Sequence, residues 1–426
     1  MGIFPQIIAP RWMSVVGLFV FVLFAWLLSA HKRRVPFRVV IGGFLVQFVL
    51  AWIVLKTSQG RAAFRVIGDF FTATLDYVDH GSQLVFGDGF TEHYFAFKVL
   101  PTIIFFSSLM AVLYHAGIVQ RIVAVFARFM QFTLGTSGAE SLSASANIFV
   151  GQTEAPLVIR PYIDSMTMSE LMTVMVGGFA TIAGGVLAAY VGMGIDAGHL
   201  VSASVISAPA ALMIGKIMQP EVETPQTLGT VKLKVERTHV NLIEAAAAGA
   251  TDGLKLALNV AAMLIAFTAL VFMADGALEY IGQLVATGLT KMTGDEYTLN
   301  WSLTGTLAWV FAPMAYLMGI EAKDCLVAGR LLGLKTAVNE LMAYDALGKI
   351  IKSDTNQLSQ RTHVILTYAL CGFANFSSIG IQLGGIGAIA PKRRPDLAKL
   401  SLRAMIGGTL AAFLTACIAG FLYEAN

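Results

Sequence analysis

Residues 151–157 read Gly151-Gln152-Thr153-Glu154-Ala155-Pro156-Leu157, and the interpretation of the whole chain depends on this stretch. An amide, a hydroxyl and a carboxylate stand side by side between a glycine and a proline, which interrupt helices and leave backbone groups without partners. In hydrocarbon, broken backbone survives only where protein buries it or where it lines a wet cavity. A carboxylate at that depth is costly and marks a functional site. The alternative is a cytoplasmic loop between two helices, where polar motifs are common.

The composition places this stretch inside a membrane protein. Of the 426 residues, 56% are hydrophobic and 13% are charged, whereas a soluble domain carries about 25% charged residues. We therefore predict an all-α polytopic membrane protein. The three cysteines lack metal-ligand spacing, the seven histidines form no HExxH pair, and no P-loop or dinucleotide fingerprint occurs. Nothing in the sequence indicates ATP-driven pumping.

Hydropathy predicts about eight transmembrane helices, because about 20 apolar residues are needed to cross the hydrocarbon layer. Two basic clusters, His31-Lys32-Arg33-Arg34 and Pro391-Lys392-Arg393-Arg394, flank such stretches, and the positive-inside rule assigns both to the cytoplasm. Both termini are then expected on the outer, periplasmic side of the inner (plasma) membrane. The predicted spans are residues 13–30, 39–55, 100–119, 171–192, 201–217, 256–273, 364–385 and 402–422.

Less apolar segments separate these spans. Residues 59–92 mix charged and aromatic residues at helical spacing, which favours an interfacial amphipathic helix over a solvated loop. A short amphipathic run is expected up to Phe132. Residues 218–255, with Lys232, are expected in the cytoplasm, with a surface helix considered at their end. Residues 274–300 are predicted to form an amphipathic connection on the outer side. Residues 303–320, which contain Pro313, fit either a span or a tilted helix that leads into the second hairpin.

The two halves of the chain share a pattern. Gly135-x4-Glu140-x-Leu142-x-Ala144 has a counterpart in Gly319-x4-Asp324-x-Leu326-x-Ala328. Both lead to a glutamate with polar neighbours, Glu154 in the first half and Glu340 in the second. Matching order across two units indicates an internal repeat.

Each unit continues into an apolar segment interrupted by glycine, Gly178-Phe179-Ala180-Thr181 in one and Gly372-Phe373-Ala374-Asn375 in the other. By the predicted topology, the first unit enters from the inside and the second from the outside. We therefore expect an inverted repeat with two opposed re-entrant hairpins. In secondary transporters of this plan, substrate and ion bind at broken helices near the midplane.

The polar residues of these elements suit a particular kind of solute. The carboxylates of Glu154 and Glu340 are expected to converge with Gln152, Asn375 and Ser378. Carboxylates accept hydrogen bonds, while amides and hydroxyls both donate and accept them. This set fits a neutral, polyhydroxylated, heterocyclic solute.

Oxygen atoms at the first helix break suit a small cation. Backbone carbonyls around 147–150 and 181–182, with the hydroxyls of Thr153 and Thr181, resemble an oxygen cage for a small hard cation. Phe373 offers a face for ring stacking, although ordinary helix packing explains it equally well. Paired carboxylates also serve glycoside hydrolysis, but no further element for activating water is evident, so we interpret them as ligands.

At these residues the chain resembles the concentrative nucleoside transporter family. Three stretches carry the resemblance in order and at the family's spacing, from near Met13 to Leu422. They are the stretch 151–157, the pattern Gly333-x-Lys335-x3-Asn339-Glu340-Leu341-Met342-Ala343-Tyr344, and Gly372-Phe373-Ala374-Asn375-Phe376-Ser377-Ser378-Ile379-Gly380.

The resemblance implies eight spans, two opposed hairpins, a homotrimer, and a mobile transport domain that carries both hairpins against a scaffold. It implies that Gln152, Thr153 and Glu154 contact the nucleobase, that Glu340, Asn375 and Ser378 hold the ribose, and that Val186 and Phe373 line the pocket. It also implies that sodium binds to carbonyls of Asn147, Val150 and Ile182 and to side-chain oxygens of Thr153 and Thr181. The second motif reads Asn-Glu-Leu-Met where many relatives have Asn-Glu-Phe-Val, which puts fine substrate preference in doubt.

The resulting hypothesis is a sodium-coupled importer of nucleosides such as uridine or adenosine, not an enzyme and without a nucleic acid polymer as partner. Residues 1–118 are expected to form scaffold spans, 119–217 the first transport repeat, 218–300 a loop with a scaffold span, and 301–426 the second repeat. The alternatives are a proton-coupled nucleoside or nucleobase transporter and a membrane-embedded nucleoside hydrolase.

Overall fold

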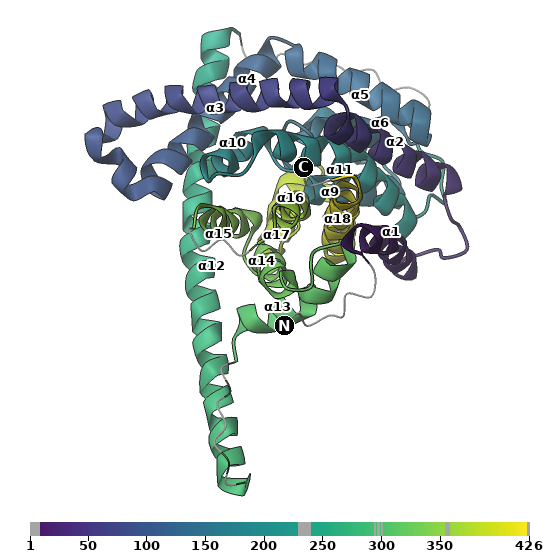
Figure 1. The fold of residues 1–426 in the computed structure, drawn as a ribbon. Coiled ribbons are helices and arrows are strands. Elements are labelled where there is room, and N and C mark those ends of the chain that lie inside the picture. The colour runs from purple at the N-terminus through teal and green to yellow at the C-terminus, as the bar shows by residue number, and fades with distance from the viewer. Residues whose placement is uncertain are drawn as a thin grey trace.

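The computed structural model describes residues 9–228, 240–293, 295, 299, 301–353 and 358–423, and every regular element among them is helical (Figure 1). The chain begins with α1 (Pro10–Leu27) and α2 (Phe37–Lys56), each long and apolar enough to cross a membrane. Then comes α3 (Ser58–Phe86), which Thr57 caps by accepting a hydrogen bond from the Gly60 amide at 2.9 Å. The predicted amphipathic helix within 59–92 is thus present, and it ends where Gly87 adopts a φ of 79°.

A short 3-10 turn (Asp88–His93) and a π-turn (Phe95–Val99) lead into α4 (Leu100–His115). Next, α5 (Ile118–Leu134) lies between Gly117 and Gly135, which both have positive φ. The short helices α6 (Gly138–Ala146), α7 (Ala155–Val158) and α8 (Arg160–Ile163) follow. The predicted span 171–192 is two helices, α9 (Met168–Ala180) and α10 (Gly184–Gly192), and α11 (Ala197–Met218) comes after them.

In the second half, as in the first, several short helices precede a long helix. It comprises α13 (Leu303–Leu317), α14 (Cys325–Ala337), α15 (Glu340–Lys352), α16 (Gln360–Leu370), α17 (Phe376–Ile389), a 3-10 turn (Pro391–Arg393) and α18 (Arg394–Leu422). The predicted span 364–385 is therefore broken between α16 and α17. Within the described residues, seven helices or helix pairs are long and apolar enough to span a membrane, and α13 and α17 are shorter apolar helices.

One helix, α12 (Leu242–Thr293), is much longer than the predicted span 256–273. It includes residues 242–255, where a surface helix was considered at the end of the cytoplasmic segment, and most of the predicted amphipathic connection 274–300. Asn241 starts it early by accepting a hydrogen bond from the Glu244 amide at 2.9 Å. No proline interrupts the helix up to Thr293, so it continues where hydropathy falls. The loop positions Lys232, Lys234 and Arg237 lie outside the described residues.

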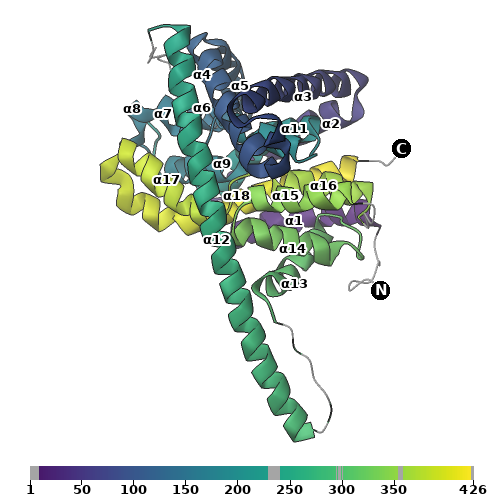
Figure 2. The ribbon, with the colours of Figure 1, turned by 90° about the vertical axis from the view of Figure 1, so that its left-hand side faces the viewer.

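The length of α12 exceeds that of an ordinary span. Its 52 residues correspond to about 78 Å at 1.5 Å per residue, and its lower part extends beyond the rest of the molecule (Figures 1 and 2). Its upper part packs on α4, where a Cβ at Gly253 would lie 2.7 Å from Cβ of Ser107 and where Ser108 donates a hydrogen bond to the Ala246 carbonyl at 2.8 Å. Small residues allow this close helix contact.

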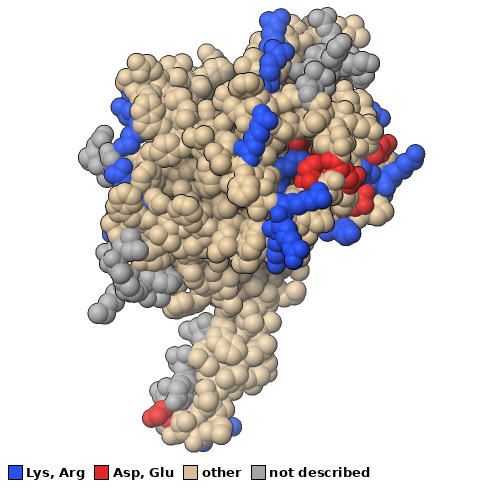
Figure 3. Space-filling model, turned by 90° about the vertical axis from the view of Figure 1, so that its right-hand side faces the viewer, with Lys and Arg blue, Asp and Glu red and all other residues tan. Residues whose placement is uncertain are grey.

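The interior is formed by α9, α11 and α18, whose residues are mostly buried, whereas α1, α2 and α12 expose many apolar side chains. Most of the face in Figure 3 carries no charge. Asp and Glu gather with several Lys and Arg at its right-hand side, and further Lys and Arg lie at its left edge and top. Arg403 of α18 donates to the carbonyls of Leu28 (3.0 Å) and Met218 (2.7 Å), while Tyr423, just beyond α18, accepts from Arg361 at 3.3 Å. These contacts mark two opposite ends of the interior.

Candidate functional site

The tip after α6 brings polar and charged side chains out of an otherwise buried segment. A Ser137–Glu140 capping box starts α6, and the chain leaves helical geometry between Ala146 and Ala155. A Cβ at Gly151 would overlap the carboxylate of Glu154, so only glycine allows the carboxylate to fold back over the backbone there. Glu154 is exposed, whereas Gln152 is buried and points inward.

The second tip lies between α14 and α15. The side chain of Asn339 caps α15 by accepting a hydrogen bond from the Met342 amide at 3.0 Å. Glu340 is the first residue of α15 and is 5% exposed. A carboxylate in the first turn is favoured by the positive end of the helix dipole. The helix start therefore offsets part of the cost of burying the Glu340 carboxylate.

Two longer helices are broken close to these tips. One break separates α9 from α10 at residues 181–183, and the other separates α16 from α17 at residues 371–375. Gly372 lies in its break with a φ of 109°, but Gly178 lies inside α9. The two Gly-Phe-Ala tripeptides thus occupy different structural positions: Phe179 is fully buried, while Phe373 is half-buried.

The two breaks also contact each other. A Cβ at Gly372 would lie 2.5 Å from the Phe179 carbonyl oxygen and 2.9 Å from that of Ala180. Positive φ and this close approach both require glycine at position 372. The carboxyl end of α9 and the bend after α16 are therefore neighbours in the interior.

A set of hydrogen bonds links the two tips through the start of α17. Gln152 donates from Nε2 to Oγ of Ser378 at 3.2 Å. Asn375 caps α17 by accepting from the Ser378 amide at 2.9 Å, and its Nδ2 donates to Oε2 of Glu340 at 3.0 Å. The structure thereby brings together Gln152, Glu340, Asn375 and Ser378, whereas the exposed Glu154, which was expected to converge with them, takes no part in these bonds. Val186 is buried on α10, and Thr153 at the first tip packs against Gly385 of α17.

Two residues of this network were not predicted. Tyr190 of α10 donates from its hydroxyl to Oε1 of Glu340 at 3.0 Å, so both carboxylate oxygens have a partner. Gln382 of α17 donates from Nε2 to Oε1 of Gln152 at 3.1 Å and to the Met175 carbonyl at 3.1 Å. Both follow a predicted residue by four positions, Val186 and Ser378 respectively, so helical spacing could have indicated them.

The predicted sodium ligands lie around the first break. The Oδ1 atom of Asn147 is buried and has no hydrogen-bond partner, while its Nδ2 donates to the Ser143 carbonyl at 3.2 Å. Thr181 donates from Oγ1 to the Gly177 carbonyl at 3.0 Å, which leaves lone pairs on the hydroxyl oxygen. A buried acceptor without a donor is what a small cation requires. Neutral oxygen donors of this kind fit sodium; the carbonyls of Val150 and Ile182 belong to the same segments.

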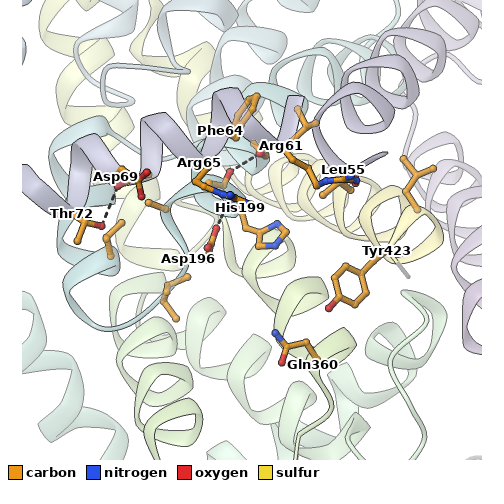
Figure 4. Close-up of a pocket in the computed structure, with 18 of the residues that line it drawn as sticks. Leu55, Arg61, Phe64, Arg65, Asp69, Thr72, Asp196, His199, Gln360 and Tyr423 are labelled. Carbon is orange, nitrogen blue, oxygen red and sulfur yellow. Dashed lines mark hydrogen bonds between the residues drawn. The ribbon is translucent and has the colours of Figure 1, made fainter. Parts of the chain in front are cut away.

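A large cavity lies elsewhere. It has a volume of about 1190 Å³ and is lined by α3, the end of α2, the turn between α10 and α11, the start of α16 and Tyr423. Figure 4 shows Arg61, Arg65 and Asp69 on one side, facing Gln360 and Tyr423 on the other. It contains none of the predicted site residues, although Val191, next to Tyr190, contributes to its wall.

Comparisons with known proteins agree with these features. Residues 199–420 match the family described as Na+ dependent nucleoside transporter C-terminus, residues 16–89 match Na+ dependent nucleoside transporter N-terminus, and residues 96–197 match Nucleoside recognition. The chain is 44% identical to Sodium/nucleoside cotransporter 1 of Rattus norvegicus over 96% of this chain and 63% of the relative. It is 42% identical to Solute carrier family 28 member 3 of Eptatretus stoutii, over 96% of this chain and 60% of the relative. The chain thus spans about three-fifths of the length of these relatives.

Solved structures match over nearly the whole chain. CNTnw in an inward-facing substrate-bound state superposes with a TM-score of 0.88 at 40% identity, covering 97% of this chain and 98% of CNTnw. A CNTnw variant in an outward-facing state superposes with the same TM-score of 0.88. The predicted all-helical, multi-span fold and the predicted family are both confirmed. With these matches over the stretches that hold both tips and both breaks, the chain belongs to the concentrative nucleoside transporter family, a family of transporters and not of enzymes.

Proposed function

We propose that this chain is a sodium-coupled symporter that imports nucleosides across the inner (plasma) membrane. The observation that carries the proposal is the set of hydrogen bonds from Gln152 through Ser378 and Asn375 to Glu340, which crosses the interior of an apolar protein. Buried polar groups are costly unless they have partners. A solute that offers hydroxyls and a heterocycle can exchange bonds with every member of this set.

The proposed substrate subsites follow from the chemistry of each side chain. Gln152, Thr153 and Glu154 at the first tip hold the nucleobase, because amide, hydroxyl and carboxylate groups match the donors and acceptors of a heterocycle. Glu340, Asn375 and Ser378 hold the ribose.

In the proposed ribose subsite, a substrate hydroxyl donates to the Glu340 carboxylate beside Tyr190 and Asn375, because each carboxylate oxygen can accept more than one hydrogen bond. Val186 and Phe373 supply apolar walls.

The proposed co-transported cation is sodium. Asn147, Val150 and Ile182 would supply carbonyl oxygens, and Thr153 and Thr181 would supply side-chain oxygens. The unpartnered Oδ1 of Asn147 supports an acceptor-rich cage at this break. Because the α9 break adjoins the backbone of Gly372, an ion there can favour the substrate-competent arrangement.

We also propose that the two hairpins are opposed members of an inverted repeat. Glu140 at the start of α6 pairs with Lys216 near the end of α11 at 2.9 Å, at the end of the interior marked by Met218. Asp324, just before α14, accepts from Thr362 near the start of α16 at 2.7 Å, at the end marked by Tyr423. Two hairpins that start from opposite ends meet in the middle, as alternating access requires.

We also propose a division of the chain into two domains. Residues 119–217 and 301–426 form the moving transport unit, and residues 1–118 with the span in 218–300 form the scaffold. A homotrimer is proposed because α12, which packs closely on α4, exposes apolar side chains, for example Ile265 and Phe272. Both termini are proposed to lie on the outer side.

The test is uptake of labelled uridine and adenosine by the purified protein in proteoliposomes, with an inward sodium gradient or with choline in its place. Sodium-dependent accumulation of intact nucleoside is expected. Uptake that depends on a pH gradient and not on sodium would show that the coupled ion is a proton. Inhibition of uptake by free nucleobases but not by nucleosides would show that the substrate is a nucleobase. Recovery of a cleaved product would indicate a hydrolase.

A further inference from the structure

Lys335 is a buried cation that the proposed transport cycle does not use. It lies near the end of α14 and is 2% exposed. Its ammonium donates to the carbonyls of Ala369 at 3.0 Å and Cys371 at 3.2 Å. No carboxylate lies within ion-pair distance of it among the residues that the structure describes. A buried charge without a counter-ion is costly, so its partners at the end of α16 must compensate for it.

The position of this ammonium has a physical reason. The last carbonyls of a helix have no partner within the helix and carry about −0.5 of an elementary charge. The end of α16 is deep inside the protein, and Gly372 turns the chain away before α17 begins. A cation is therefore needed at this helix end, and Lys335 provides it from the neighbouring hairpin.

The first half of the chain has the same arrangement without a lysine. There α9 ends at Ala180 beside the first hairpin, and the unpartnered Oδ1 of Asn147 lies in that hairpin. The proposed sodium ion would face the carboxyl end of α9 as the ammonium faces that of α16. Each half thus pairs a broken helix with a hairpin and a positive charge.

We propose that the ammonium of Lys335 is a tethered counterpart of the transported sodium ion, which permanently fills the cation position of the second hairpin. This inference rests on the proposed sodium-coupled function. Lys335 is a positioning residue: it joins the end of α14 to Cys371, while Glu340 joins the start of α15 to Asn375. These two links fix the tip between α14 and α15 against the break between α16 and α17. Glu340 and Asn375 are thereby held at the spacing that the ribose requires.

The decisive variant is Lys335→Gln, which keeps a hydrogen-bond donor for the two carbonyls but removes the charge. Without the tethered cation, a free sodium ion is needed at the second break as well as the first. We expect nucleoside affinity to fall at least tenfold at low sodium and to recover at high sodium. We also expect a steeper sodium dependence than in the unmodified protein, in both uptake and the melting temperature of purified protein.

The matched control is Arg330→Met, which removes an exposed positive charge from the same helix and should leave both curves unchanged. A Lys335→Gln variant with the unmodified protein's affinity and sodium curves would overturn the inference. If Lys335→Gln cannot be recovered in either sodium or potassium, Lys335→Arg replaces it. An unchanged sodium curve with that charge-retaining variant supports the inference, and a steeper one overturns it. Failure of the unmodified protein to transport would count against the proposed function alone, because the melting curves test Lys335 without transport.

Discussion

At the scale of single residues, the carboxylate of Glu340 holds the centre of the site. It accepts hydrogen bonds from Tyr190 and Asn375 on its two oxygens. Glu340→Gln keeps the size but replaces a charged acceptor with an amide, and hydrogen bonds to charged groups contribute about 1.5–3 kcal/mol. We expect nucleoside uptake to fall to about a tenth or less. Proteoliposome uptake measures this, with the exposed Glu92→Gln as control; uptake with unchanged KM would remove Glu340 from the ribose subsite.

Tyr190 is predicted to orient that carboxylate. Tyr190→Phe deletes the bond to Oε1 but keeps the ring that packs on Tyr344 with centroids 4.5 Å apart. One lost hydrogen bond corresponds to a rise in nucleoside KM of about three- to tenfold, with little change in maximal rate. The control is Tyr344→Phe, whose hydroxyl donates to the Thr367 carbonyl at 2.7 Å instead. Equal effects of the two variants would assign Tyr190 to packing alone.

Thr181 is predicted to act on the ion. Thr181→Ala removes a proposed sodium ligand at the α9 break, so we expect a higher sodium concentration for half-maximal uptake and an almost unchanged nucleoside KM at saturating sodium. The matched control is Thr173→Ala, because the Thr173 hydroxyl also donates to a carbonyl four residues earlier in α9, at 2.8 Å. Sodium titrations of uptake that coincide for all three proteins would contradict the role of Thr181.

At the scale of elements, the contact between the two helix breaks depends on Gly372. Gly372→Ala introduces a side chain at a φ of 109° and places its Cβ against the Phe179 and Ala180 carbonyls. Strain of this kind costs about 1–3 kcal/mol, so the melting temperature and nucleoside binding should both fall. Gly380→Ala in α17 meets no atom within 4 Å and should leave both unchanged. A stable, active Gly372→Ala protein would show that the breaks need not touch.

Particular elements show how much of the fold and of the candidate site the sequence predicts. The motifs at 151–157 and 339–340 located both tips, because glycine, proline and a polar cap act locally on the backbone. The break between α9 and α10 lies at 181–183, where free carbonyls were predicted around 181–182, but Gly178, quoted as interrupting the helix, lies inside α9. The extent of α12 was missed because hydropathy falls where the helix continues. Tyr190 and Gln382 were missed because their partners are distant in the chain.

At the scale of the whole molecule, α12 exposes a long apolar surface beside its contact with α4. Leu258, Ile265 and Phe272 are largely exposed in the isolated chain. We expect three copies to associate through these helices, and light scattering of the detergent-solubilised protein, corrected for bound detergent, measures the mass. Introducing Asp at Ile265 should shift the mass towards one copy, whereas the same change at the exposed Phe19 of α1 should not. A single copy in the unmodified protein would contradict the trimer.

The charges at the two tips have an electrical consequence. If the carboxylates of Glu154 and Glu340 and the ammonium of Lys335 are all charged, the empty site carries one net negative charge. A sodium ion makes the loaded site neutral, and a nucleoside adds nothing. Membrane voltage then acts on the return of the empty carrier, with about 2.3 kcal/mol per charge for each 100 mV. An interior-negative cell would thereby speed up the resetting of the transporter, while the step that carries the cargo proceeds independently of voltage.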